Sequence, residues 1–320
     1  MNQHRITPLT ESGLLAALAV VLAMAAFYLP IVGIVAALLW ALPVIILTVR
    51  HGLRWGILSV LAAGVIMAVL IEPVLSLRMA VSFAPAGLVL GYGFRRAWPG
   101  ARTFGLALAA SIAGKLLALA LLFAVTAVNP LNMEMEAVRE TFAQTFQLYE
   151  SAGVDPETLA KSREEIQAGL DMLKLLLPLI VIMMGLFDTA VGYLLGTRVL
   201  RRLGHAVPQL PSFAEWRLPS GFLYLFGFSL VGLYWGGAHD IPWLYQISLN
   251  GDMLAIFAGL VQGLSIAHCL MKHYKLSPFV RIAIYVMLLL NSFLAQFVAL
   301  TGLMDMLFDY RRRFAGRDGK

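Results

Sequence analysis

The sequence contains little charge and almost no cysteine. Asp, Glu, Lys and Arg make up only 13% of its 320 residues, whereas a soluble domain carries about 25%. A chain with so few charged side chains is not expected to form a solvated globular domain. The single cysteine, Cys269, excludes an internal disulfide framework and a metal site built from several cysteines.

Common motifs of catalysis and nucleotide binding are also missing. The Gly114-Lys115 pair is found in phosphate-binding loops, but Ala109 stands where such a loop needs glycine and Leu116 where it needs Ser or Thr. The sequence has neither a Gly-x-Ser-x-Gly nor a His-Glu-x-x-His motif. We therefore expect no enzyme, no catalytic residue, no cofactor, no metal site and no ATPase within this chain.

What the chain has instead is a series of long apolar stretches. Hydrophobic residues make up 60% of the sequence, and the stretches are long enough to cross a hydrocarbon core of about 30 Å. Backbone polar groups in lipid must be satisfied within their own segment, so these spans are helices. We predict an all-α polytopic integral membrane protein. The expected spans lie at about 12–29, 31–49, 55–72, 79–94, 103–128, 173–197, 220–237, 252–271 and 279–304.

The basic residues fall in alternate loops between these spans. This pattern predicts that the N-terminus is cytoplasmic, because cytoplasmic loops carry an excess of Lys and Arg. The same distribution explains the net charge of +6 without a nucleic-acid partner. The basic loop residues are Arg50, Arg54, Arg95, Arg96, Arg102, Arg198, Arg201, Arg202, Arg217, Lys272, Lys275 and Arg281.

The end of the sequence conflicts with a count of nine spans. Nine crossings would place the basic tail, residues 311–320, on the outside, although its sequence "RRRFAGRDGK" indicates a cytoplasmic location. Either the last apolar stretch is bent or re-entrant near Asn291-Ser292, or an earlier segment does not cross. We favour an even number of crossings and a cytoplasmic tail.

Residues 130–172 form a polar insert between two spans. Asp155-Pro156 is typical of a helix N-cap followed by proline at the first helical position. Apolar residues recur at helical spacing on both sides of this point. We predict an extracytoplasmic amphipathic helical hairpin, which serves either as a lid or partner surface or as a solvated linker.

Lys115 is the only charged residue between positions 103 and 128. A charge inside the membrane is costly and usually finds a partner. Lys115 lies 12 residues and Asp188 lies 9 residues from the cytoplasmic ends of consecutive spans, an offset of about 5 Å. We predict an intramembrane ion pair, which is either structural or part of a solute or proton pathway. Glu72 and Arg78 form a second candidate polar pair at the outer face, where snorkelling is the alternative.

Two further patterns occur within the spans. The first span contains the small-residue pairs Gly13/Ala17 and Ala19/Ala23, which allow close helix approach and make this helix a candidate docking face. Polar residues also occur deep in the last two spans. His268 is expected to form an interhelix hydrogen bond, because no second ligand lies at metal-binding spacing on its helix.

The whole chain resembles a known family. The segments "TESGLLAALAVVLA", "GVDPETLAKSREEIQ", "LPSFAEWRLP" and "LFDYRRR" resemble, in their order, the YybS-like family of multi-pass bacterial membrane proteins of unknown function. Residues 8–204 are also similar in layout to the S components of energy-coupling-factor importers. That resemblance implies a six-helix substrate-binding bundle whose first helix docks on a coupling subunit driven by ATPases. The chain departs from it in a short first outer loop and in three or four additional C-terminal membrane helices.

These observations leave two functions open. The first is a small-solute-binding or transport protein of the bacterial cytoplasmic (inner) membrane, with membrane lipid, an unknown small solute and an ATPase-driven coupling module as partners. The second is a membrane scaffold or regulatory protein with no transported ligand. In either case we expect a bundle at 8–204, a cytoplasmic linker at 205–219, membrane helices at 220–310 and the basic tail.

Overall fold

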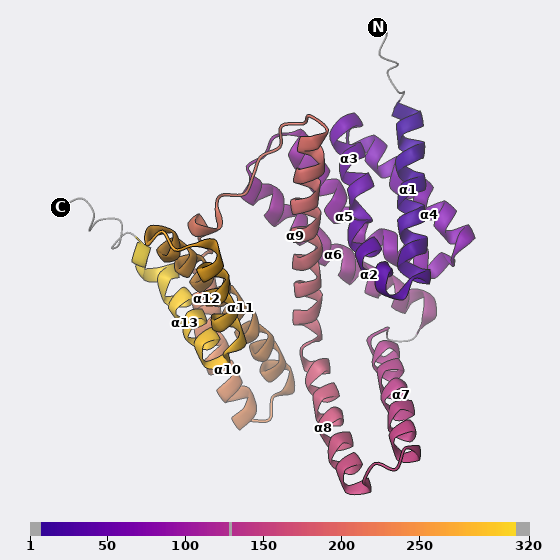
Figure 1. Ribbon diagram of the computed structural model, residues 1–320. Helices are drawn as coiled ribbons and strands as arrows, with labels where there is room; N and C mark the ends of the chain where they lie inside the picture. The colour runs from indigo at the N-terminus through magenta and orange to yellow at the C-terminus, as the bar shows by residue number, and fades with distance from the viewer. Residues whose placement is uncertain (1–7, 128–129, 312–320) are drawn as a thin grey trace, which may run out of the picture. The chain divides into compact units, whose positions relative to one another are not determined.

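The computed structural model describes residues 8–127 and 130–311, and every regular element in this part of the chain is a helix. The chain divides into two compact units (Figure 1). Unit 1 contains the described residues up to Leu170 together with Ile180–Leu210, and unit 2 contains Asp171–Leu179 and the described residues from Pro211 onward.

Eight helical segments of the described residues are long and apolar enough to cross a membrane, which confirms the all-α polytopic fold. The segments that pack in unit 1 are α1 (Pro8–Tyr28), α2 (Pro30–Leu39) joined to α3 (Ala41–His51), α4 (Leu53–Leu70), α5 (Pro73–Arg95), α6 (Gly100–Thr126) and α9 (Leu177–Arg202). Unit 2 contributes α10 (Gly221–Ala238) and α11 (Pro242–His273).

Two spans begin earlier than predicted, because each helix starts at a proline that the apolar pattern did not include. α5 begins at Pro73 and not near residue 79, and its first turn is capped by Glu72. α11 begins at Pro242 and not near residue 252. The first ten residues of α11 contain several polar side chains, which made this part of the helix look like a loop.

The polar insert forms two helices, α7 (Pro130–Ser151) and α8 (Pro156–Leu175). The Asp155 carboxylate accepts hydrogen bonds from the backbone N–H and the hydroxyl of Thr158, both at 3.0 Å, which is the predicted N-cap. Arg163 of α8 donates to Glu150 of α7 at 2.6 Å. The two helices of this hairpin are therefore joined across their turn. Which side of the membrane the hairpin occupies stays a prediction.

The helices of unit 2 pack closely through glycines. If Gly302 carried a Cβ atom, that atom would lie 2.5 Å from the backbone nitrogen of Gly263 and would overlap the carbonyl oxygen of Gly259. Gly302 belongs to α13 (Ser292–Phe308), and the other two glycines belong to α11. Van der Waals contact between small residues is a main source of helix association in lipid, so this contact holds α13 on α11.

The last apolar stretch is broken. α12 (Pro278–Leu290) and α13 are bent by 100° at Asn291. The pair begins next to the end of α11, and it ends where Asp309 accepts a hydrogen bond from Arg217 at 2.9 Å, just before α10 begins. α10 and α11 form an antiparallel hairpin, so the start of α10 lies beside the end of α11. The start of α12 and the end of α13 therefore both lie at this one end of the α10–α11 hairpin.

A helix pair that leaves and returns on one side is re-entrant and does not cross. By length and composition the described residues offer eight spanning helices, or nine if the bent pair counts as one span. A re-entrant pair fits the first of the two alternatives that the basic tail raised. The even number of crossings and the cytoplasmic location of the tail stay predictions. Residues 312–320 of the tail lie outside the described residues.

Candidate functional site

The predicted ion pair between Lys115 and Asp188 is present. Lys115 of α6 and Asp188 of α9 form a salt bridge, and Lys115 is only 7% exposed. The ammonium group also donates to the hydroxyl of Ser111 at 3.4 Å. The pair lies within unit 1, in helices long enough to span the membrane.

Close packing of α5 and α6 brings Lys115 to this position. Pro85 lies inside α5 and has no N–H to donate to the carbonyl of Val81 four residues earlier. A Cβ atom on Gly114 would lie 2.6 Å from that carbonyl oxygen and 3.1 Å from the Pro85 ring. Only glycine fits here, so the Gly-Lys pair of the sequence is a helix-packing feature followed by a buried charge.

Two aromatic residues extend the polar centre. The ammonium of Lys115 lies 4.8 Å from the centre of the Phe83 ring, a cation–π contact. The ring of Trp40 lies 6.4 Å from the same ring. Trp40 is fully buried, and its indole N–H has no hydrogen-bond partner. Buried polar groups of this kind are rare in proteins and call for an explanation.

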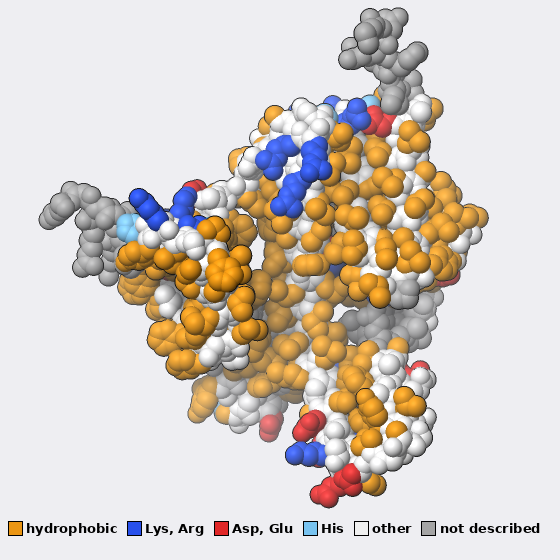
Figure 2. All heavy atoms as spheres, in the orientation of Figure 1, with side chains coloured by type: hydrophobic (Ala, Val, Ile, Leu, Met, Phe, Trp, Pro, Cys, Tyr) orange, Lys and Arg blue, Asp and Glu red, His pale blue; other side chains and the backbone are white. Residues whose placement is uncertain are grey.

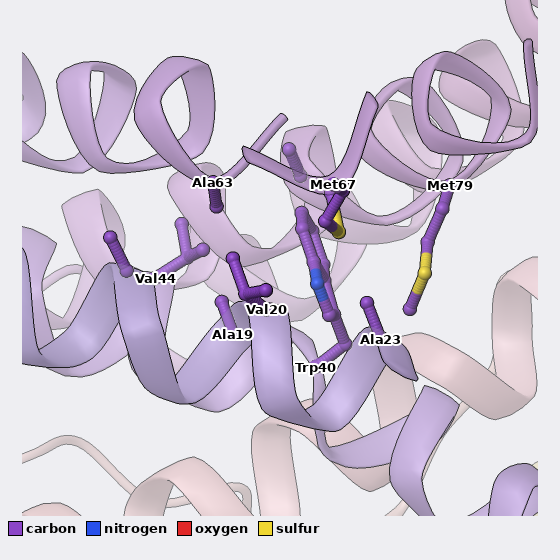
Figure 3. Close-up of a cluster of buried hydrophobic side chains, with 10 residues drawn as sticks. Ala19, Val20, Ala23, Trp40, Val44, Ala63, Met67 and Met79 are labelled. Atoms are coloured by element: carbon purple, nitrogen blue, oxygen red, sulfur yellow. The ribbon is translucent and has the colours of Figure 1, made fainter. Parts of the chain in front are cut away.

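A cluster of buried apolar side chains surrounds Trp40 (Figure 3). Met67 of α4 and Met79 of α5 lie beside its ring, together with Ala19 and Ala23 of α1. Methionine adapts to irregular spaces, and alanine lets α1 approach closely. Sequence reasoning missed Trp40 and Phe83, because an aromatic residue in an apolar stretch carries no sign that it will meet a charge.

The same cluster corrects the predicted docking face. Ala19 and Ala23 are buried inside unit 1, so they do not belong to an exposed surface with Gly13 and Ala17. Gly13 and Ala17 are exposed, and a Cβ atom on Gly13 would meet nothing within 4 Å. The prediction of one docking face of four residues is therefore wrong, because half of those residues pack internally.

The two members of the predicted outer polar pair, Glu72 and Arg78, lie at the start of α5. The Glu72 carboxylate caps α5 by accepting from the backbone N–H groups of Val74 at 3.1 Å and Leu75 at 2.8 Å. Arg78 lines a small hollow between α5 and α6, together with residues such as Leu77 and Leu122. Pairing between Glu72 and Arg78 stays a prediction.

A second buried acid of unit 1 was not predicted. Glu11 near the start of α1 is buried and forms a salt bridge with Arg50 at the end of α3. It also contacts the His51 ring nitrogen Nε2 at 2.6 Å. This contact joins α1 to α3 at one end of the bundle. A lone acid in the first turn of an apolar helix was the only signal in the sequence.

Unit 2 has a polar centre of its own, built around Asp305. Its carboxylate accepts from the Gln262 amide at 2.7 Å and lies 3.6 Å from the guanidinium of Arg311. Arg311 is 9% exposed and donates to the carbonyl of Ala214 at 2.5 Å and to Ser265 at 3.0 Å. The second half of the predicted linker is therefore held against unit 2.

The interhelix role predicted for His268 is confirmed. Its ring nitrogen Nδ1 lies 2.7 Å from the hydroxyl of Tyr285 in α12. Within residues 8–127 and 130–311, no group of three or more His, Cys, Asp or Glu side chains could hold a metal ion.

Comparison with known proteins identifies the family. Residues 17–306 match the family described as "Predicted membrane protein (DUF2232)". The chain belongs to this family. It is also 26% identical over 322 residues to "Uncharacterized protein YybS" of Bacillus subtilis (strain 168), with 98% of this chain and 99% of that protein covered. The YybS-like resemblance is thereby confirmed, and no solved structure matches the chain.

Proposed function

We propose that unit 1 binds a small solute inside the membrane, in the manner of the substrate-binding components of energy-coupling-factor importers. The observation that carries this proposal is a polar group in which the Lys115–Asp188 ion pair and the buried Trp40 both lie near the ring of Phe83. It combines an ion pair, a cation–π contact and an indole N–H without a partner.

The energetic cost of this group supports a binding role over a purely structural ion pair. Two helices can be fixed together by apolar packing, and replacing a buried ion pair by apolar residues is often neutral or stabilising. The indole N–H of Trp40 adds a second cost, because this donor is removed from water without gaining a hydrogen-bond partner. A ligand with hydrogen-bond acceptors would satisfy that donor and could also share the Lys115 ammonium. We therefore expect a solute that carries carbonyl, carboxylate or aromatic nitrogen atoms.

The proposed role is binding and not catalysis. For transport, the energy would come from an ATPase-driven coupling module, because the sequence contains no nucleotide-binding motif. Gly13 and Ala17 are the two exposed small residues of α1, and they are the part of the predicted docking face on which such a module could still pack. The surrounding lipid is the remaining partner.

We also propose that the protein lies in the bacterial cytoplasmic membrane with the start of α1 facing the cytoplasm. Basic residues lie at the ends of α3, α5 and α9. Because consecutive spans cross the membrane in opposite directions, we expect these three helix ends to lie on the same side. Figure 2 shows Lys and Arg side chains gathered near the C-terminal end of α9, with a hydrophobic surface over the spanning helices. This distribution follows the positive-inside rule.

Native mass spectrometry of the protein, gently purified from its own membranes, tests the binding role. The wild-type protein should carry a reproducible small-molecule adduct, with or without co-purifying ATPase and coupling subunits. The double variant Lys115→Met/Asp188→Leu should lose the adduct. A matched control, Glu150→Gln/Arg163→Gln, removes an exposed ion pair of the hairpin and should keep it.

The same measurement separates the alternative function. Wild-type protein that carries only lipid, from preparations in which the helical structure is intact, would contradict solute binding. It would favour a membrane scaffold or regulatory protein with no transported ligand. An adduct that survives in the double variant would place the solute away from Lys115.

A further inference from the structure

α11 contains an acidic residue, Asp252, at which the predicted span of about 252–271 begins. Asp252 is the eleventh residue of this helix, so it lies well inside it. It is 7% exposed. Its position is seven residues before Gly259 and eleven before Gly263, which places it on nearly the same helix face. That face packs against α13.

Asp252 differs from the other buried acids of the spanning helices. Glu11 and Asp188 each form a salt bridge with a basic side chain. Asp305 accepts from Gln262 and from the backbone N–H of Tyr310, and it lies near Arg311. The carboxyl oxygen Oδ1 of Asp252 is buried without a hydrogen-bond partner in the described structure.

The elements packed around α11 bring no cation to this carboxyl. α10 contains no Asp, Glu, Lys, Arg or His, and its two tyrosines are exposed. Asp305 is the only such residue in α13. α12 carries Arg281, which donates to the carbonyl of Leu276, and Tyr285, which contacts His268.

The end of α8 also belongs to unit 2. Its residues Asp171 and Lys174 form an exposed pair with each other. On α11 itself, the titratable residues after Asp252 are His268, Cys269, Lys272 and His273. The first of these is sixteen residues further on, about 24 Å along the helix.

An ionised carboxylate without a partner is very unfavourable in a membrane interior. Two ligands could neutralise it, a proton or a metal cation. A cation such as Na⁺ or Ca²⁺ needs several oxygen ligands. The nearby amide of Asn250 is already used, since it accepts from the Leu179 N–H and donates to the carbonyl of Leu175. No cluster of acidic side chains lies at Asp252 within the described residues.

We propose that Asp252 is a proton-binding site within the membrane-embedded part of unit 2. Its carboxyl group is a carboxylic acid in the arrangement seen here, and it loses its proton only when the helices around it rearrange or admit water. This gives the C-terminal helices a function of their own, proton uptake and release. The inference does not rest on solute binding by unit 1.

A hydrophobic carbodiimide, such as dicyclohexylcarbodiimide, tests the site in the intact protein. The oxygen of a protonated carboxyl group adds to the carbodiimide carbon while the acid proton passes to a nitrogen. The O-acylisourea formed then rearranges to a stable N-acylurea, and no atom leaves. We expect an adduct on the Asp252 peptide by mass spectrometry, decreasing as the pH is raised, with Asp305 unlabelled.

Variants make this assignment specific. Asp252→Asn should abolish the adduct, whereas Asp305→Asn should leave labelling at Asp252 in place. An unlabelled Asp252 in folded protein would overturn the proposal, and so would labelling that Na⁺ suppresses at constant pH, because that result would assign the site to a cation.

Thermal stability provides a second, independent measurement. Replacing a neutral carboxylic acid by a neutral amide of the same shape should leave the unfolding midpoint of Asp252→Asn unchanged. Asp305→Asn should lower it, because Arg311 loses the charge of its partner. An equal loss in both variants would show that Asp252 is ionised and paired, and would contradict the proposal.

Discussion

The substitution Gly302→Ala tests the packing of α13 on α11. The new Cβ atom would lie 2.5 Å from the nitrogen of Gly263 and 2.9 Å from the carbonyl carbon of Gly259, and it would overlap the carbonyl oxygen of Gly259. Cβ contacts shorter than 3.0 Å are essentially never seen. All three neighbours are backbone atoms, so no side chain can rotate away. The two helices must separate by about 1 Å along their contact to bring the new Cβ atom to 3.0 Å from the carbonyl oxygen of Gly259.

The free-energy change follows from two opposing terms. Overpacking costs about 1–3 kcal/mol, and the rigidity of backbone neighbours places this site at the upper end. Alanine is favoured over glycine in a helix by about 1 kcal/mol. We therefore expect Gly302→Ala to lower the free energy of unfolding by about 2 kcal/mol.

The natural Cys269 reports this change directly. It is the only cysteine of the chain and lies on α11, six residues after Gly263. Its alkylation by a fluorogenic maleimide during heating measures the unfolding of unit 2. Gly227→Ala in α10 is the matched control, because a Cβ atom there meets nothing within 4 Å. An unchanged midpoint in Gly302→Ala would refute the close packing.

Two further predictions concern unit 1 and the topology. Either Lys115→Met or Asp188→Leu alone should destabilise the protein by about 3–5 kcal/mol, while the double variant regains most of this loss, as measured by thermal loss of helical circular dichroism. The topology is tested with single cysteines introduced in a Cys269→Ser background and an impermeant maleimide. Asp240→Cys, expected outside, should be labelled on intact cells. Gly204→Cys and Tyr310→Cys, expected inside, should be labelled only after permeabilisation. Labelling of Tyr310→Cys on intact cells would contradict the re-entrant pair.

Features that depend on local chemistry were predictable from the sequence. Apolar length gave the spans, the Asp155-Pro156 pair gave a helix start, and the polar Asn291-Ser292 step marked a break. The partner of Lys115 was also predictable. A lone charge in lipid needs a counter-ion, and a helical rise of 1.5 Å per residue limits the possible depths.

Features that depend on which helices meet were not predictable. Nothing local distinguishes the alanines of α1 that pack on Trp40 from those that remain exposed. Arg311 looks like one member of a basic tail, but it is buried through contacts with Ala214, 97 residues away, and with Ser265 and Asp305. Asp252 was placed at the edge of a span because the polar first turns of α11 hide where that helix begins.

A re-entrant pair has a consequence for biogenesis. Two helices that return to the side from which they started are not inserted as an ordinary hairpin with a loop on the far side. The surface of α11 on which α13 packs is formed by Gly259 and Gly263, and it exists only once α11 is helical. We therefore expect the α10–α11 hairpin to form before α13 packs on it.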